Sequence, residues 1–119
     1  MSFIRKNFAF GTLAAGINTV VLQLTMAAGH TLPISAGIFR LTIWDVAHYP
    51  DPATDPTLEI VTAEYSGTPN VYNIIRAQES TLGQNHLAGH KAALHYTAGV
   101  SESDLLVYDI DYKCFLITK

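Results

Sequence analysis

Strict alternation of apolar and polar residues limits what this chain can fold into. Residues 19–26, TVVLQLTM, place Val20, Leu22 and Leu24 on one side, and residues 37–44, GIFRLTIW, repeat the pattern. A period of two residues with many β-branched side chains is typical of a half-buried β-strand and does not produce a helical face. Both segments are therefore predicted to be strands.

The same pattern predicts the remaining strands. Residues 57–65, TLEIVTAEY, and 71–77, VYNIIRA, are joined by SGTPN, which predicts a hairpin with a five-residue connection. Residues 92–98, AALHYTA, form a fifth strand, and residues 106–116 alternate as one long strand or as a second hairpin. We prefer the hairpin because these eleven residues exceed the usual strand length of roughly 3–10 residues.

These segments predict an all-β domain, either a small sandwich or a partly open barrel of six to seven strands. A helix near residues 8–17 is the alternative, although Gly11 and Gly16 count against it. Residues 1–18 mix apolar side chains with glycine and asparagine, and we expect them to form an N-terminal interaction arm. Residues 19–119 then make a single β domain. Its expected core comprises Val20, Leu22, Leu24, Phe39, Leu41, Ile43, Ile74 and Leu94.

The low share of charged residues favours association with other chains. Charged residues make up 14% of the 119 residues, whereas a typical soluble monomer has about 25%. The net charge of −3 provides no basic stripe that would neutralise nucleic acid phosphates. No segment reaches the ~18 apolar residues of a membrane-spanning helix, so neither nucleic acid nor a membrane is an expected partner. A single cysteine, Cys114, excludes an internal disulfide framework.

No constellation of side chains in the sequence indicates catalysis, a cofactor or a metal. His86 and His90 have a spacing that suits one helical face, but they fall in a glycine-punctuated loop without a near third ligand. We expect both to face solvent or a backbone carbonyl. Asp51, Asp55 and Glu59 carry oxygen ligands that suit calcium but lack the glycine-centred calcium loop. No nucleophile elbow or phosphate-binding loop is present, so the chain is not expected to be an enzyme.

The strand that ends near Arg76 is followed by a predicted structural corner. Glu79 lies close enough in the chain to pair with Arg76 where the strand leaves the sheet. Thr81 would satisfy backbone groups in the turn, and Gly83 punctuates the loop that follows. A buried ion pair at this point would set the geometry of the corner more than its stability.

Aromatic side chains provide an alternative reading of the surface. Trp44, Tyr49 and Tyr65, together with Tyr72, would stack on sugars if the β scaffold exposed them, or would pack in the core or in an interface. A carbohydrate-binding module is therefore retained as a second class of function.

The stretch 59–99 resembles a motif of tailed-bacteriophage virion structural proteins. That motif reads E-I-V-x-V-T, a glycine-containing turn, an apolar strand, R-A-Q-E-G-T, a loop with A-x-G, and a strand that ends in T-A. The corresponding segments here are EIVTAEYSG, VYNIIRAQEST and HLAGHKAALHYTAG, preceded by IFRLTIWD and YPDPATDP. The resemblance covers about residues 29–99 and departs from the motif at Ser80, where the family has glycine. The RAQE tetrapeptide is weak evidence by itself, whereas the ordered set is specific.

The resemblance implies a place in the virion, because such modules occur in fibre-base, head-fibre and capsid-associated proteins. The chain is little longer than the module and has no collagen-like or coiled-coil shaft, which favours a small attached protein over a complete fibre. We therefore expect a capsid decoration or cement protein, or a fibre-base adaptor. Its expected partners are copies of itself, a trimer by preference, and other virion proteins such as the major capsid or tail proteins. A receptor-binding carbohydrate module is the alternative.

Overall fold

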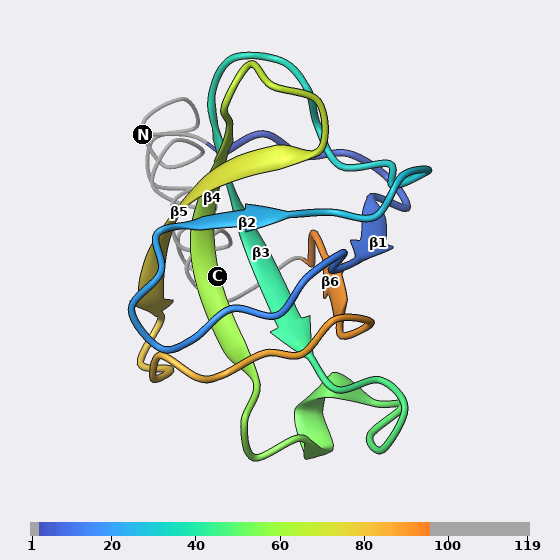
Figure 1. Ribbon diagram of the computed structural model, residues 1–119, viewed down its shortest axis with the longest axis vertical. Coiled ribbons are helices and arrows are strands. Elements are labelled where there is room, and N and C mark those ends of the chain that lie inside the picture. The colour runs from blue at the N-terminus through green and yellow to red at the C-terminus, as the bar shows by residue number, and fades with distance from the viewer. Residues whose placement is uncertain (1–2, 96–119) are drawn as a thin grey trace, which may run out of the picture.

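The computed structural model describes residues 3–95, and in that range the chain is all-β (Figure 1). One antiparallel sheet of six strands, in the spatial order β1-β6-β3-β4-β5-β2, curls into a half-barrel. The elements are β1 (Phe10–Thr12), β2 (Gln23–Thr25), β3 (Ile38–Trp44), the short 3₁₀ helix η1 (Pro52–Thr54), β4 (Glu59–Tyr65), β5 (Val71–Gln78) and β6 (Lys91–Ala93). The all-β prediction is confirmed, in its barrel form. The expected hairpin over residues 106–116, with Cys114, lies outside the described residues.

The first and last strands of this order meet at one end of the half-barrel. Leu13, directly after β1, forms an antiparallel bridge with Met26, directly after β2. The backbone N–H of Ala27 donates to the carbonyl oxygen of Thr12 at 2.8 Å beside this bridge. The sheet is thus partly closed, and one face of each strand packs against a single core.

The three central strands are the long ones, and they match the predicted segments. β3, β4 and β5 have seven, seven and eight residues, and they pair in sequence order. The β4–β5 hairpin turns through Gly67 and Asn70, whose φ angles of 93° and 67° lie in the left-handed region that glycine and asparagine tolerate. The predicted hairpin with its five-residue connection is therefore confirmed.

The core lies inside the curl of the sheet and departs from the predicted list at two positions. Val20 and Leu22 are 73% and 63% exposed, because the regular strand begins only at Gln23. The side chain of Asn18 accepts hydrogen bonds from the amides of Val20 and Val21, both at 3.0 Å, and this turn breaks the alternation. Leu94 is partly buried against the core. The buried core residues are Ala9, Leu13, Leu24, Met26, Leu32, Phe39, Leu41, Ile43, Val61, Ala63, Tyr72, Ile74 and Ala92.

The N-terminal segment is part of the sheet, which corrects the expected boundary at residue 18. Phe10 pairs with Ala93 at the start of the β1–β6 ladder, and neither an arm nor a helix occupies residues 8–17. Gly11 is needed at this place, since a Cβ there would lie 2.6 Å from the Cβ of His30. The glycine that reads as a break in the sequence is therefore the residue that allows β1 to dock.

Candidate functional site

A buried carboxylate and a buried guanidinium hold the corner where β5 leaves the sheet. The Glu59 side chain is 0% exposed and the Arg76 side chain is 7% exposed. Their ion pair is bidentate, with Arg76 Nε 2.8 Å from Glu59 Oε2 and Nη2 2.9 Å from Oε1. Two parallel contacts fix the orientation as well as the distance of the two groups.

Arg76 also donates to three backbone carbonyl oxygens from two other segments. Nη1 donates to Asn18 O at 2.6 Å and to Val21 O at 2.9 Å, and Nη2 donates to Gln84 O at 2.7 Å. All five N–H groups of the guanidinium are then used, which is the most that arginine offers. The side chain joins β5 to the segment before β2 and to the loop after β5, which run side by side (Figure 1).

Glu59 is held in its charged form by this corner. It accepts further hydrogen bonds from the amides of Ala77 and Gln84, both at 3.0 Å, and His86 Nε2 lies 2.9 Å from Oε1. Burial raises the pKa of Glu59, but the hydrogen bonds from Arg76, His86 and the two amides outweigh burial and hold the pKa well below its ordinary value. The ionised carboxylate only accepts, so Nε2 of His86 carries the proton of that contact. A carboxylate saturated in this way serves structure and has no free lone pair for acid–base work.

The expected pairing of Arg76 with Glu79 is wrong. Arg76 pairs across the sheet with Glu59, whereas Glu79 Oε2 accepts from Nη1 of Arg40 on β3 at 2.8 Å. Glu79 and Ser80 have left-handed φ angles of 53° and 67°, so the backbone turns sharply between β5 and the loop. The turn takes the side chain of Glu79 to β3 rather than back onto β5.

Thr81 and Gly83 belong to the same corner. Thr81 Oγ1 accepts from the amide of Ile60 at 3.0 Å and donates to the carbonyl oxygen of Gln78 at 2.7 Å. Gly83 packs so closely that a Cβ would lie 2.9 Å from the carbonyl oxygen of Thr19. The structure therefore brings all the predicted corner residues to one place, but with a different ion pair.

The sequence contains a pattern from which the pairing of Glu59 with Arg76 could have been predicted. Glu59 shares the phase of Val61 and Ala63, which face the core, and Arg76 shares the phase of Ile74 on the adjacent strand. Opposite charges at inward positions of neighbouring strands predict a buried cross-strand pair. His86 has no such signal, because it lies in a loop and reaches the corner through a bridge with Ile17.

The histidine expectations are partly corrected. His86 is 1% exposed and lies against Glu59, so it faces neither solvent nor a carbonyl. The rings of His86 and His90 are 5.8 Å apart, edge to face.

Asp55, one of the three candidate calcium ligands, is buried, and its carboxylate accepts from the amides of Asp45 and Thr57, at 2.8 Å and 2.7 Å. Residues 3–95 contain no group of three ligating side chains placed to hold a metal ion.

A groove with aromatic walls lies on the face of β1, β6 and β3 that is turned away from the core. Its volume is about 490 Å³, and its main lining residues are Phe8, Phe10, Trp44, Pro50, Pro52 and Lys91. The strand register produces this arrangement, because Ala93 lies opposite Phe10 on β1 and Lys91 lies opposite Trp44 on β3. The small side chain of Ala93 leaves a hollow between larger neighbours.

A cation sits among the rings of this groove. The Lys91 ammonium lies 4.7 Å from the centre of the Phe10 ring and 5.8 Å from that of Trp44. The Trp44 side chain is buried, and its Nε1 has no acceptor among the described residues. His95 packs against Trp44 at 5.4 Å; burial, with Lys91 adding to it, lowers the pKa of His95. His95 is therefore neutral near pH 7, and Lys91 carries the charge of the groove.

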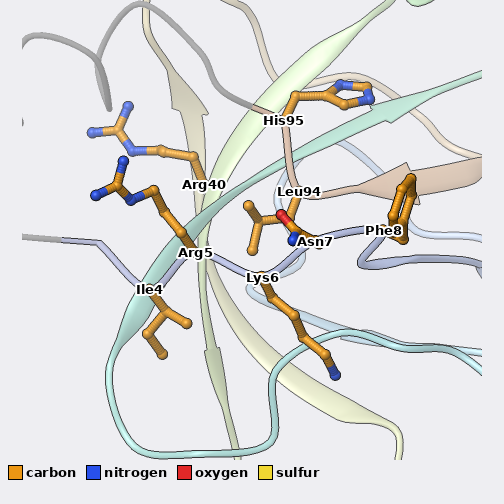
Figure 2. A pocket seen from close by; sticks show the side chains of 8 residues that line it. All are labelled: Ile4, Arg5, Lys6, Asn7, Phe8, Arg40, Leu94 and His95. Carbon is orange, nitrogen blue, oxygen red and sulfur yellow. The ribbon is translucent and has the colours of Figure 1, made fainter.

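A smaller cavity of about 220 Å³ adjoins the groove and shares Phe8, Leu94 and His95 with it. Figure 2 shows Arg5 and Arg40 extending toward the same side of this cavity, away from Phe8 and His95. Among the described residues, every lysine and arginine other than Arg76 lines one of the two cavities, and no carboxylate lines either. One of these cations is compensated, since Arg40 pairs with Glu79 at 2.8 Å.

The structure separates the aromatic residues predicted as ligand or interface contacts. Trp44 lines the groove, whereas Tyr65 packs on Tyr72 at a ring distance of 5.6 Å at the far end of β4. Tyr49 is half-buried in the loop between β3 and η1. The other rings of the groove, Phe8 and Phe10, escaped the sequence analysis because they fall in the segment taken for an arm.

Large apolar side chains are exposed along the side of the half-barrel formed by β2 and β5. Val20 and Leu22 precede β2, Ile75 lies on β5 and Leu82 follows β5, with exposed fractions of 60–73%. We call these four the β2-side apolar residues. Several such side chains on one side of a protein mark a surface for other molecules.

No protein-family model matches the sequence, and no curated protein matches it. In the described part of the chain, no helix is long and apolar enough to cross a membrane.

Proposed function

We propose that this protein is a non-enzymatic building block of a bacteriophage virion, a small capsid decoration or cement protein or a fibre-base adaptor. The observation that carries the proposal is the exposure of the β2-side apolar residues on a chain with only 14% charged residues. Such a surface gains free energy when it is covered by a second protein surface. The resemblance of residues 59–99 to virion modules supplies the class of partner.

The proposed assembly is a homo-oligomer, a trimer by preference, that attaches to the major capsid or tail proteins. Attachment at many equivalent positions of a lattice holds each copy firmly even when a single contact is weak. The Glu59–Arg76 corner supports this role, because it fixes the shape of the loop that presents Leu82. A repeated building block needs that rigidity more than it needs a reactive group.

The first test is the mass of the protein in solution, by sedimentation velocity of the full chain and two variants. Leu82→Glu adds a charge among the β2-side apolar residues and is expected to yield monomers. Leu87→Glu is the matched control, since Leu87 is an exposed leucine (66%) outside that group. We expect the wild type and Leu87→Glu to sediment as the same oligomer.

The second test is imaging of particles that lack the protein after purified protein is added. Regular added density, reduced for Leu82→Glu, supports the proposal. A strictly monomeric wild type together with particles that gain no density would refute it.

A further inference from the structure

We propose that the groove between β1, β6 and β3 binds a saccharide that bears a carboxylate. This inference concerns a different side of the molecule from the β2-side apolar residues and does not depend on assembly. It uses three properties of the groove: exposed ring faces, one cation that pairs with no carboxylate of residues 3–95, and a hollow of suitable size.

The exposed rings are those of Phe8 and Phe10, and the backbone of Phe8 adopts an unfavourable conformation. Phe8 is 88% exposed and has a left-handed φ of 55°. A bulky residue in this conformation is strained, and such strain concentrates at binding and catalytic sites. Phe10, the first residue of β1, is 46% exposed. The C–H faces of a sugar ring would cover these two rings and remove their apolar surface from water.

The cation selects an anionic ligand. Lys91 forms no ion pair with any described carboxylate, and the rings of Phe10 and Trp44 are the partners of its ammonium. Since no acidic residue in the described range lines the groove and His95 is neutral near pH 7, a ligand carboxylate would meet the positive charge of Lys91.

The size of the groove suits a small ligand. Its volume of about 490 Å³ falls within the roughly 300–1,000 Å³ of typical small-molecule sites, which combine apolar walls with a few polar groups. Pro50 and Pro52 close the groove on the side of η1. Ala93 forms the small floor on which one face of the ligand would rest.

Two other ligand classes fit these observations less well. An acidic peptide usually binds by adding a strand to a free edge, but the outer edge of β1 is already bonded to Thr31, by Phe10 N to Oγ1 at 3.0 Å and Thr31 N to Phe10 O at 2.9 Å. A nucleic acid would need a row of cations along its phosphates, whereas the groove supplies one lysine. A saccharide with a single carboxylate needs only what the groove offers.

Trp44 gives a direct assay, because it is the only tryptophan of the chain and lines the groove. An oligosaccharide of uronic acids is titrated into the full-length protein while the tryptophan fluorescence is recorded, with calorimetry in parallel. Its carboxyl-reduced form serves as the neutral comparison. We expect saturable binding of the acidic form, and binding of the neutral form weaker by about tenfold or more, since a hydrogen bond to a charged group contributes about 1.5–3 kcal/mol.

Variants identify the residues responsible. Lys91→Met keeps the alkyl chain and is expected to weaken binding by about tenfold, while Phe8→Ser, at an exposed position, also weakens it. Lys6→Met is the matched control, because Lys6 lines the adjoining cavity and not the groove. Melting curves of all three variants verify that the fold is retained.

The proposal is overturned by any of four outcomes: no saturable binding in calorimetry, equal affinity for the neutral form, unchanged affinity in Lys91→Met, or binding of an acidic peptide but of no saccharide. Failure here leaves the oligomer test unaffected, because that test uses variants on the other side of the molecule.

Discussion

Removal of the charge of Glu59 should be the most damaging conservative substitution in the described part of the chain. In Glu59→Gln, the amide nitrogen replaces one carboxylate oxygen and cannot accept a hydrogen bond. It must face either the donors at Oε2, which are Arg76 Nε and the Ala77 amide, or the donors at Oε1, which include the Gln84 amide. At least two buried donors lose their acceptor, and the guanidinium of Arg76 stays buried without a counter-charge.

The size of the effect follows from the burial of both partners. Breaking a buried ion pair by removing one member costs about 3–5 kcal/mol. A small domain has only about 5–15 kcal/mol of stability, so this loss is a large fraction of the whole. The corresponding drop in melting temperature is about 10 °C or more. Urea unfolding followed by circular dichroism measures the change in the free energy of unfolding.

Glu64→Gln provides the matched control. Glu64 lies on the same strand with its side chain exposed, and its substitution should change the free energy of unfolding by less than about 0.5 kcal/mol. If Glu59→Gln unfolds within about 1 kcal/mol of the wild type, the corner is not the centre of stability that its geometry indicates.

The pH dependence of the same variant has a definite sign. The pKa of Glu59 is held far below its ordinary value of 4.5 by the hydrogen bonds that overcome burial, whereas the unfolded chain titrates near that value. The contribution of Glu59 to stability is therefore fully present above about pH 4.5 and is lost as the pH falls further, because the unfolded state then binds the proton first. The difference in stability between wild type and Glu59→Gln should shrink on acidification below pH 4.5. A constant difference down to pH 3 would contradict this linkage.

Two substitutions in the turn after β5 should have opposite effects on the free energy of unfolding in the same urea experiment. Ser80→Gly should raise it by about 0.5–1 kcal/mol, because Ser80 has a left-handed φ of 67° that costs a side-chain-bearing residue free energy; a loss of stability would show that the serine side chain is needed. Gly83→Ala should lower it by about 1–3 kcal/mol, because the added Cβ would meet the Thr19 carbonyl oxygen at 2.9 Å; an unchanged value would mean that the contact yields without cost.

The central strands could be predicted because their alternation is produced by burial. Phe39, Leu41 and Ile43 follow one another at every second position, and all three are completely buried. The predicted ranges of these strands differ from the observed ones by two residues at most. A run of seven or eight residues has enough positions for the period to be recognised.

The outer strands were predicted less well than the central ones. The predicted strand over residues 19–26 is regular only over the three residues of β2, and β1, also of three residues, falls in the segment that was expected to be an arm. The place of β1 depends on the absence of a side chain at Gly11 beside His30, and the start of β2 depends on the turn made by Asn18. The first contact joins residues far apart in the chain, whereas the Asn18 turn is local and involves only Val20 and Val21.

At the candidate sites, too, the features that depend on strand order and register could not be predicted from the sequence. The corner was recognisable as a corner from its polar residues, but its ion pair joins Glu59 to Arg76 across a β4–β5 ladder whose register shifts between Ile60 and Thr62. The groove needs Phe8 and Phe10 to lie beside Trp44, which only the order β1-β6-β3 brings about.

The bridge between Leu13 and Met26 affects how copies of this protein can meet. A sheet grows into a fibril by edge-to-edge pairing, which needs a strand with a row of unpaired amides and carbonyls. Here the chain after β1 pairs with the chain after β2, and the outer edge of β1 bonds to Thr31, so each outer strand has partners within its own molecule. Neighbouring copies would then make contact through side chains, whose shapes limit the number of partners, rather than through an endless hydrogen-bonded ladder. The proposed oligomer, which would have to stop at a fixed number of copies, would benefit because each molecule satisfies the edges of its own sheet.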